Sequence, residues 1–418
     1  MKLNSIIFTI FLLVGYSYPA VAETHIDPDV ALEAKSQLAL AIKTGEIEGG
    51  MVLVHANGKE IMLDVQGYHD IEDQLPFKES SLIRIYSMTK PITSVAAMTL
   101  WEEGKFELDD PVSKYIPSFK NAKVGKVERP FGRMSPNSFE LTSPEREITV
   151  RDLLTHSAGY TYGGADYPNS PFAKGYRNRG VTFWGPENMF PPKMSIQKAA
   201  QLLSEVPLRH EPGERWTYGL NTDIVGALIE IWSGMELGEY FKESIFKPLG
   251  MEDTFFKIPE EKMHRFTSCH LKKETGVAVI DKWNSSPYRD GFEFQSGGGG
   301  LVSTIQDYAK FSIMLANWGE SNGKRILEKS TLEKMFEKHF PIGEMADFGL
   351  GFAIEPVVLG NNPKAQFEQY GWSGYAGTWF RVIPESNISM IFMRQGLPYS
   401  VDFAESLFET IRKGIIIE

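Results

Sequence analysis

A pair of short apolar runs around Asn57-Gly58 constrains the fold of this chain more than any other feature. Residues 51–54 precede this turn and residues 61–65 follow it. An Asn-Gly pair between apolar runs is the strongest short-range signal for a β-hairpin, because both residues tolerate the positive φ angles of a tight turn. The sequence therefore predicts an antiparallel pair of strands near the start of the chain.

A second hairpin is predicted near the other end. Residues 378–383 and 388–393 are apolar runs on either side of a Pro-Glu-Ser-Asn turn. Helical patterns accompany both hairpins, since apolar positions recur at helical spacing in residues 30–44 and in residues 401–415. Together these patterns predict an α+β fold, in which helices flank an antiparallel sheet built from both chain ends.

The stretch between the hairpins is predicted to form a mostly helical lobe, inserted into the sheet lobe. We place the sheet lobe at residues 23–85 and 290–418, and the helical lobe at residues 86–289. Two segments of the helical lobe, residues 120–147 and 160–193, are rich in Gly, Pro, Asn and charge, and are expected to be polar loops. Loops of such length are usually functional.

The first 22 residues have the pattern of an export signal. Lys2 supplies the positive start, residues 6–14 form a short apolar core, and Ala20-Val21-Ala22 is a small-residue cleavage site. The apolar core is too short to be a stable membrane anchor. We therefore expect cleavage after Ala22 and export, most simply into a bacterial periplasm, with residues 23–418 as the mature domain.

Charge and composition limit the partners and cofactors. The formal net charge of -11 at pH 7 argues against nucleic acid and against an anionic membrane surface as partners. The eight histidines show no H-E-x-x-H or similar spacing, so no metal ion is expected, and no motif predicts another cofactor. Cys269 is the only cysteine and is expected to be buried as a small apolar residue. The sequence leaves the oligomeric state open.

Ser87 and Lys90, within Ser-Met-Thr-Lys, form a candidate catalytic pair. A serine hydroxyl is a weak nucleophile that needs a base, and a lysine three residues further along a helix lies above it. The same spacing begins at Ser195, which is expected to cap a helix, and at Ser321, which is expected to lie in a loop. Ser87 differs because it follows an apolar run and precedes a helical pattern that starts at Pro91. On spacing alone, a helix cap explains Ser87 equally well.

Two further segments could complete a site around this serine. Tyr218 lies between a Pro-Gly turn and a helical pattern, where its phenol can face a cleft and act as a general base. The alternative is a tyrosine packed in a loop. Residues 371–375 (Gly-Trp-Ser-Gly-Tyr) lie just ahead of a predicted strand, where backbone N–H groups could stabilise an oxyanion, although a glycine-rich turn alone explains them better. His156 could pair with a serine or have a structural hydrogen-bonding role.

Six segments become specific when they are taken together and in order. They are residues 87–90, 148–159, 211–218, 248–251, 296–304 and 371–374. With these segments the chain resembles the serine β-lactamase and penicillin-binding-protein-like superfamily, most closely the family VIII carboxylesterases. The resemblance runs from about Leu32 to the C-terminus. It implies a β-lactamase/transpeptidase-like fold and a serine hydrolase domain in the mature chain.

The resemblance also implies a role for each candidate residue. Ser87 would be the acylated nucleophile, with Lys90 and Tyr218 as the general base and acid. The backbone N–H groups of Ser87 and Tyr375 would form the oxyanion hole. Substrate contacts would come from Trp372, Ser373, Gly374 and Asn221. The implied reaction cleaves a small-molecule carboxylic ester through an acyl-enzyme, which water or another alcohol releases.

Two positions depart from the β-lactamase pattern and favour neutral esters. Trp372 stands where β-lactamases have a lysine or histidine that holds the substrate carboxylate, and an indole cannot pair with a carboxylate. Leu220 stands where the second motif has an asparagine, which here follows one residue later as Asn221. The alternative function, a β-lactamase or D,D-peptidase, needs a cation that Arg381 or Arg394 could supply. A non-catalytic binding module is a third hypothesis.

Overall fold

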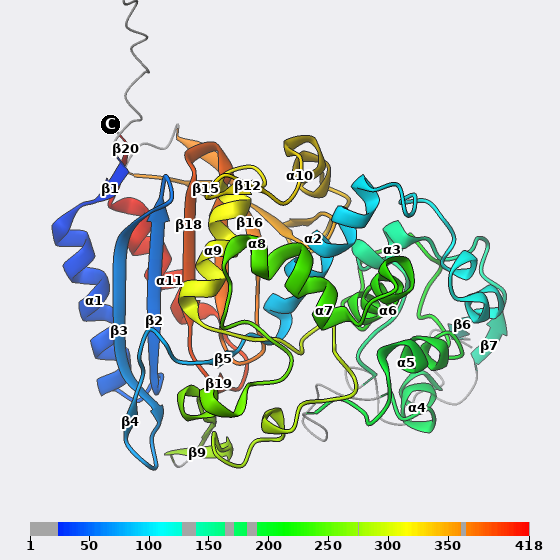
Figure 1. Ribbon diagram of the computed structural model, residues 1–418, viewed down its shortest axis with the longest axis horizontal. Helices are drawn as coiled ribbons and strands as arrows, with labels where there is room; N and C mark the ends of the chain where they lie inside the picture. Colours follow the sequence, from blue (N-terminus) through cyan, green and yellow to red (C-terminus); the bar gives the residue numbers. More distant parts are fainter. Residues whose placement is uncertain are drawn as a thin grey trace, which may run out of the picture.

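A nine-stranded antiparallel sheet holds the two predicted hairpins side by side (Figure 1). The first hairpin is formed by β2 (Gly49–Ala56) and β3 (Lys59–Asp70), and the second by β17 (Trp379–Ile383) and β18 (Ile388–Met393). β18 pairs with β2, so segments from the two ends of the chain meet inside the sheet. The predicted α+β fold, with a sheet built from both chain ends, is confirmed.

The computed structural model describes residues 24–127, 139–163, 171–181, 190–274, 276–360 and 365–417. The expected signal peptide lies outside these residues, so export stays a prediction. Among the helices that the structure describes, none is both long and apolar enough to cross a membrane.

Further strands extend the sheet, in the order β13-β14-β15-β16-β17-β18-β2-β3-β4. These strands are β4 (Leu75–Pro76), β13 (Phe340–Pro341), β14 (Asp347–Phe348), β15 (Ala353–Val358) and β16 (Gln366–Ser373). Outside this sheet, β1 (Thr24–Ile26) pairs with β20 (Ile415–Ile417). The last predicted helix, α11 (Asp402–Lys413), therefore ends earlier than expected, because the final residues pair as a strand.

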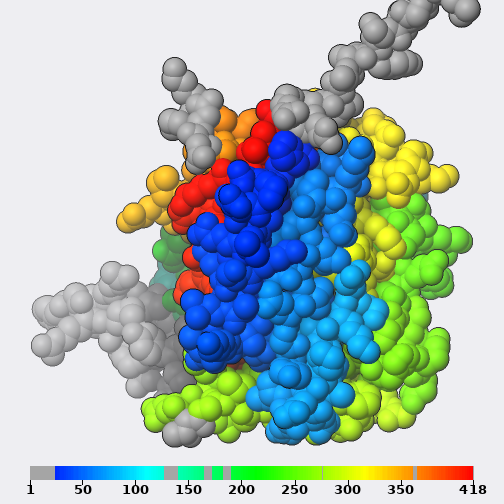
Figure 2. All heavy atoms as spheres, turned by 90° about the vertical axis from the view of Figure 1, so that its left-hand side faces the viewer, coloured from blue at the N-terminus to red at the C-terminus, as the bar shows by residue number. Residues whose placement is uncertain are grey.

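The central strands supply two hydrophobic cores, because successive side chains of a strand point to opposite faces. In β2, Met51 and Leu53 belong to one core, whereas Val52 and Val54 belong to the other. α1 (Pro28–Lys43) and α11 pack against each other over the second core (Figure 2). α9 (Ile305–Ala316) contributes to the first core and contacts β2, β17 and β18.

Helices dominate the segment between the hairpins, beside the sheet in Figure 1. They are α2 (Thr89–Glu102), α3 (Val150–Leu154), α4 (Pro171–Asn178), α5 (Ile196–Leu203), α6 (Asn221–Ser233), α7 (Leu237–Phe241) and α8 (Lys247–Leu249). α2 packs against α6, and both contribute to the first core. α10 (Lys329–Met335) follows α9. Ser195 caps α5 by accepting a hydrogen bond from the Lys198 N–H, as predicted.

Short strands complete the structure. They are β5 (Ile83–Arg84), β6 (Val124–Val127), β7 (Phe139–Thr142), β8 (Cys269–Lys273), β9 (Gly276–Asp281), β10 (Val302–Ser303), β11 (Glu320–Ser321), β12 (Lys324–Arg325) and β19 (Gly396–Leu397). The two expected loops are not loops throughout, because one contains the hairpin β6–β7 and the other contains α4. The rest of each expected loop falls partly in residues 128–138, 164–170 and 182–189, which lie outside the described part of the chain.

Candidate active site

Ser87 lies at the turn that leads from β5 into α2. β5 pairs with β10, and residues 86–88 form a single 3-10 turn before α2 begins at Thr89. Tyr86 has a φ angle of 43°, a left-handed conformation that costs a non-glycine residue about 1 to 3 kcal/mol. Tyr86 and Met88 are buried, whereas Ser87 between them is only half-buried. The strained turn therefore leaves Ser87 partly exposed.

A fully buried arginine holds β5 in place below this turn. Arg84 forms an ion pair with Asp281 at 2.5 Å and donates a hydrogen bond to the carbonyl of Thr267 at 2.6 Å. Its guanidinium also lies over the ring of Phe266, 3.9 Å from the ring centre. These contacts fix the segment just ahead of Ser87.

Replacement of Asp281 by alanine is expected to lower the free energy of unfolding by about 3 to 5 kcal/mol, because it leaves a buried guanidinium without its counter-ion. Chemical denaturation measures this loss. Glu409→Ala is the matched control, since Glu409 pairs with Lys413 on the exposed face of α11 and its loss should leave the free energy of unfolding nearly unchanged. Equal losses in the two variants would contradict the role given to Arg84.

Lys90 lies one helical turn after Ser87 and contacts three oxygen atoms. Its ammonium nitrogen is 3.2 Å from the hydroxyl of Ser87, 2.8 Å from the hydroxyl of Tyr162 and 2.5 Å from the carbonyl of Gly298. Only 1% of the Lys90 surface is exposed. The structure thus brings the predicted pair together in a setting where lysine has little contact with water.

Tyr218 and Trp372 meet beside this pair. Tyr218 precedes α6, and the centre of its ring lies 4.8 Å from the Lys90 nitrogen. Its hydroxyl accepts a hydrogen bond from the indole N–H of Trp372 at 3.1 Å. The sheet, through Trp372, and the helical lobe, through Tyr218, therefore meet at the candidate site.

Tyr162 is a site residue that the sequence motifs did not single out. Its hydroxyl, not that of Tyr218, forms the hydrogen bond with Lys90, and its ring packs edge-on against Tyr218 at 5.5 Å. Burial is the main cause that raises the pKa of Tyr162 well above its ordinary value, so its phenol stays protonated near neutral pH. The only sequence signal for it is its place shortly after the segment 148–159.

His156 has a structural position rather than a position beside a serine nucleophile. It is buried, and its ring nitrogens face the side chains of Asn221 at 2.9 Å and Thr222 at 3.4 Å. Burial lowers the pKa of His156 well below its ordinary value, and the charge of Lys90 lowers it further. A neutral imidazole at this point anchors the start of α6.

Asn221 is a correction to the expected substrate contacts. Its side chain is fully buried, and its amide donates toward the His156 ring and the Thr217 carbonyl. Each residue turns a helix by about 100°, so an asparagine one position late points in another direction. Asn221 therefore stabilises the helix start instead of facing a substrate.

Residues 371–375 lie just ahead of the strand β17, as expected, and they also include the end of β16. Trp372 and Ser373 are the last residues of β16, and the turn that follows packs against the Ser87 segment. A Cβ atom at Gly374 would clash with the carbonyl oxygen of Ile85, and the Tyr375 ring packs edge-on against Tyr86 at 5.9 Å. The hydroxyl of Ser373 lies 2.9 Å from that of Tyr399.

The two N–H groups that were expected to form an oxyanion hole are both available. Among the described residues, no hydrogen bond uses the backbone N–H of Ser87 or of Tyr375. The close packing of Gly374 on Ile85 brings their two segments together. Free N–H groups beside a nucleophile can stabilise developing negative charge on a carbonyl oxygen.

The two arginines that could have held a substrate carboxylate are already paired. Arg381 makes two contacts of 2.8 Å with the carboxylate of Glu355. Arg394 is nearly buried and pairs with Glu48 at 3.2 Å. Neither guanidinium is free to replace the lysine of the β-lactamase motif.

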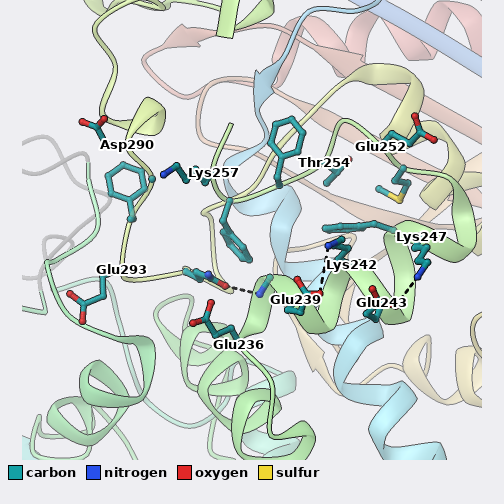
Figure 3. Close-up of a pocket in the computed structure, with 18 of the residues that line it drawn as sticks. Glu236, Glu239, Lys242, Glu243, Lys247, Glu252, Thr254, Lys257, Asp290 and Glu293 are labelled. Carbon is teal, nitrogen blue, oxygen red and sulfur yellow. Dashed lines mark hydrogen bonds and ion pairs between the residues drawn. The ribbon is translucent and has the colours of Figure 1, made fainter. Parts of the chain in front are cut away.

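A separate cavity of about 860 Å³ shares none of these residues (Figure 3). α7 and the residues after it line one side, with Lys242 and Glu239 in contact, and residues 254–257, 290–293 and Gln295 line the other. Gln295 belongs to its wall and accepts a hydrogen bond from the Gly238 N–H at 2.6 Å. This cavity is therefore not the candidate site, although its wall adjoins the segment that contains Gly298.

Comparison with known proteins identifies the family of this chain. A sequence model of the family described as Beta-lactamase matches residues 26–408. The chain belongs to the Beta-lactamase family. Protein Rv1367c of Mycobacterium tuberculosis is 29% identical to this chain over 381 residues, which cover 87% of this chain and 90% of Rv1367c. Esterase EstB of Burkholderia gladioli is 25% identical over 362 residues, covering 81% of this chain and 84% of EstB.

Solved structures share the fold of this chain. EstCE1, described as a hydrolase with promiscuous acyltransferase activity, superposes with a TM-score of 0.73 at 24% identity. The match covers 92% of this chain and 98% of EstCE1. The chain thus has the fold of a hydrolase family whose members similar to it include esterases.

Proposed function

We propose that this protein is a serine carboxylesterase that cleaves small neutral esters through an acyl-enzyme on Ser87. The observation that carries the proposal is the 3.2 Å contact between the Ser87 hydroxyl and the side-chain nitrogen of the buried Lys90. A serine with a lysine base at hydrogen-bond distance is an activated nucleophile. EstB, an esterase, and EstCE1, a hydrolase, support the same reaction class.

Acylation begins when the Ser87 oxygen attacks the ester carbonyl and its proton passes to Lys90, in its neutral form. The carbonyl oxygen then becomes negative and accepts hydrogen bonds from the N–H groups of Ser87 and Tyr375. As the tetrahedral intermediate collapses, the bond to the alkoxy group breaks. The proton reaches the leaving alcohol from Lys90, either directly or through the phenol of Tyr218.

Deacylation repeats these steps with water. Water attacks the acyl carbon while Lys90 accepts its proton, either directly or through the phenol of Tyr218, and the proton then returns to the Ser87 oxygen as the carboxylic acid leaves. An alcohol in place of water would give a new ester, the reaction of an acyltransferase. The Tyr162 hydroxyl accepts a hydrogen bond from the Lys90 nitrogen and so helps to hold it beside Ser87.

The residues around Ser87 favour neutral esters over β-lactams. Trp372 offers an apolar wall and one N–H group, which is already bound to Tyr218. Arg381 and Arg394 are held by Glu355 and Glu48, so they offer no cation to a substrate carboxylate. Penicillins, cephalosporins and D-Ala-D-Ala peptides carry such a carboxylate and lose this interaction.

A substrate screen tests the proposal. Purified protein should hydrolyse short-chain p-nitrophenyl esters with a kcat/KM that exceeds the value for a chromogenic cephalosporin and for a D-Ala-D-Ala peptide. A rapid burst with the cephalosporin, stronger than with any ester, would instead favour the β-lactamase or D,D-peptidase alternative. No turnover of any of the three would favour a binding module.

Trp372→Phe is expected to reduce kcat/KM for p-nitrophenyl acetate by up to about tenfold. The variant keeps an aromatic wall but removes the N–H group that holds Tyr218, and one such hydrogen bond contributes about 0.5 to 1.5 kcal/mol. Trp283→Phe is the matched control, because the Trp283 indole N–H has no partner among the described residues. Equal kinetics for Trp372→Phe and the wild type would contradict the role given to this contact.

A further inference from the structure

Asp223 is a carboxylate buried behind the candidate site, in the first turn of α6. Only 1% of its surface is exposed. One carboxylate oxygen accepts hydrogen bonds from the Ser296 hydroxyl at 2.6 Å and from the Gly298 N–H at 3.1 Å. The other oxygen has no hydrogen-bond partner among the described residues. A half-satisfied buried carboxylate is costly, so a compensating charge is expected nearby.

Gly298 links this carboxylate to Lys90. Its N–H faces Asp223, while its carbonyl accepts the hydrogen bond from the Lys90 ammonium at 2.5 Å. A Cβ atom at Gly298 would lie 2.5 Å from the unpartnered oxygen of Asp223, so only a glycine lets the carboxylate approach this closely. The hydroxyl of Thr93 donates a hydrogen bond to the carbonyl of the neighbouring Gly297 at 2.7 Å, which helps to hold the same segment.

We propose that Asp223 is a positioning residue that fixes the Gly298 carbonyl on Lys90 and balances the charge of the lysine. The catalytic part of this role rests on the proposed function. Among the described residues, the titratable groups that face Lys90 are Tyr162, Tyr218, His156 and Asp223. Asp223 is the one carboxylate in this set, and burial keeps both His156 and Tyr162 uncharged near neutral pH.

The electrostatics agree with the geometry. Burial raises the pKa of Asp223, whereas the Lys90 charge and the hydrogen bonds from Ser296 and Gly298 oppose that rise. The attraction between the carboxylate of Asp223 and the charge of Lys90 acts on both groups. The carboxylate therefore favours the form of the site that carries the additional proton. Removal of the negative charge should therefore ease the loss of a proton from the Ser87–Lys90–Tyr218 group, whichever member holds it.

A double-mutant cycle with Lys90→Met and Asp223→Asn tests the pairing without any need for activity. In the wild-type background, Asp223→Asn should lower the midpoint of thermal unfolding, because Lys90 loses its counter-charge. In the Lys90→Met background the same change should raise the midpoint, because it neutralises a carboxylate left without a cation. An Asp223→Asn variant that folds only together with Lys90→Met would support the proposal equally. The same midpoint change in both backgrounds would overturn it.

The pH dependence of kcat/KM separates positioning from simple structural support. Asp223→Asn, which keeps the shape and an acceptor oxygen, should move the acidic limb to lower pH by about one unit. Ser296→Ala is the matched control, since it removes a hydrogen bond to Asp223 but keeps the charge, and its acidic limb should stay in place. An acidic limb at the same pH in Asp223→Asn and in the wild type would overturn the electrostatic role of Asp223. Failure of the proposed function would show differently, as ester hydrolysis that survives in Ser87→Ala.

Discussion

Ser87→Ala should lower kcat for p-nitrophenyl ester hydrolysis by about 10⁴-fold or more, the loss seen when a serine nucleophile is removed from a hydrolase. The change deletes the oxygen that forms the acyl-enzyme and leaves Lys90, Tyr218 and the two free N–H groups in place. Residual turnover would come from those groups alone. Steady-state kinetics with the purified variant measure the effect.

Ser195→Ala is the matched control for this experiment. Ser195 begins the same Ser-x-x-Lys spacing, but its side chain caps α5. Its loss should cost about 1 kcal/mol of stability and leave kcat unchanged. A Ser87→Ala variant as active as Ser195→Ala would remove Ser87 from the mechanism.

Lys90→Met should lower kcat by about 10² to 10⁴-fold, because it removes the base that takes the Ser87 proton while filling nearly the same volume. The KM should change little, since Lys90 is buried and its hydrogen bonds, within the described part of the chain, go to Ser87, Tyr162 and Gly298. Steady-state kinetics with p-nitrophenyl acetate measure both constants.

Lys198→Met provides the corresponding control, because Lys198 has the same spacing from Ser195 and is exposed. It should keep the wild-type kcat. If Lys90→Met kept it as well, the serine would need another base, and Tyr162 or Tyr218 would be the first candidates.

The fold could be predicted largely from local chemistry. Asn57-Gly58 adopts positive φ angles at both residues and connects β2 to β3, as the dipeptide predicts. The pairing of β18 with β2 agrees with the predicted sheet built from both chain ends. Such pairing covers an exposed edge of each apolar hairpin. The extra strand β20 was missed, since the predicted helix ran to residue 415, which is the first residue of this strand.

The site could be predicted only where a motif carried the chemistry. The Ser87–Lys90 contact follows from helix geometry, because both residues lie within one turn. Tyr162 and Gly298 reach Lys90 across 72 and 208 residues of sequence, and no local pattern encodes such contacts. Asn221 was predicted to contact substrate, but it lies one helical position later than the asparagine of the motif. Its side chain is instead in buried contact with His156.

Covalent labelling of the nucleophile tests the central claim most directly. The wild-type protein is incubated with a fluorophosphonate, digested, and analysed by mass spectrometry for the modified peptide. We predict a single adduct on Ser87, formed rapidly in the wild type, slowly in Lys90→Met and not at all in Ser87→Ala. An adduct on any other residue, or one that persists in Ser87→Ala, would contradict the account.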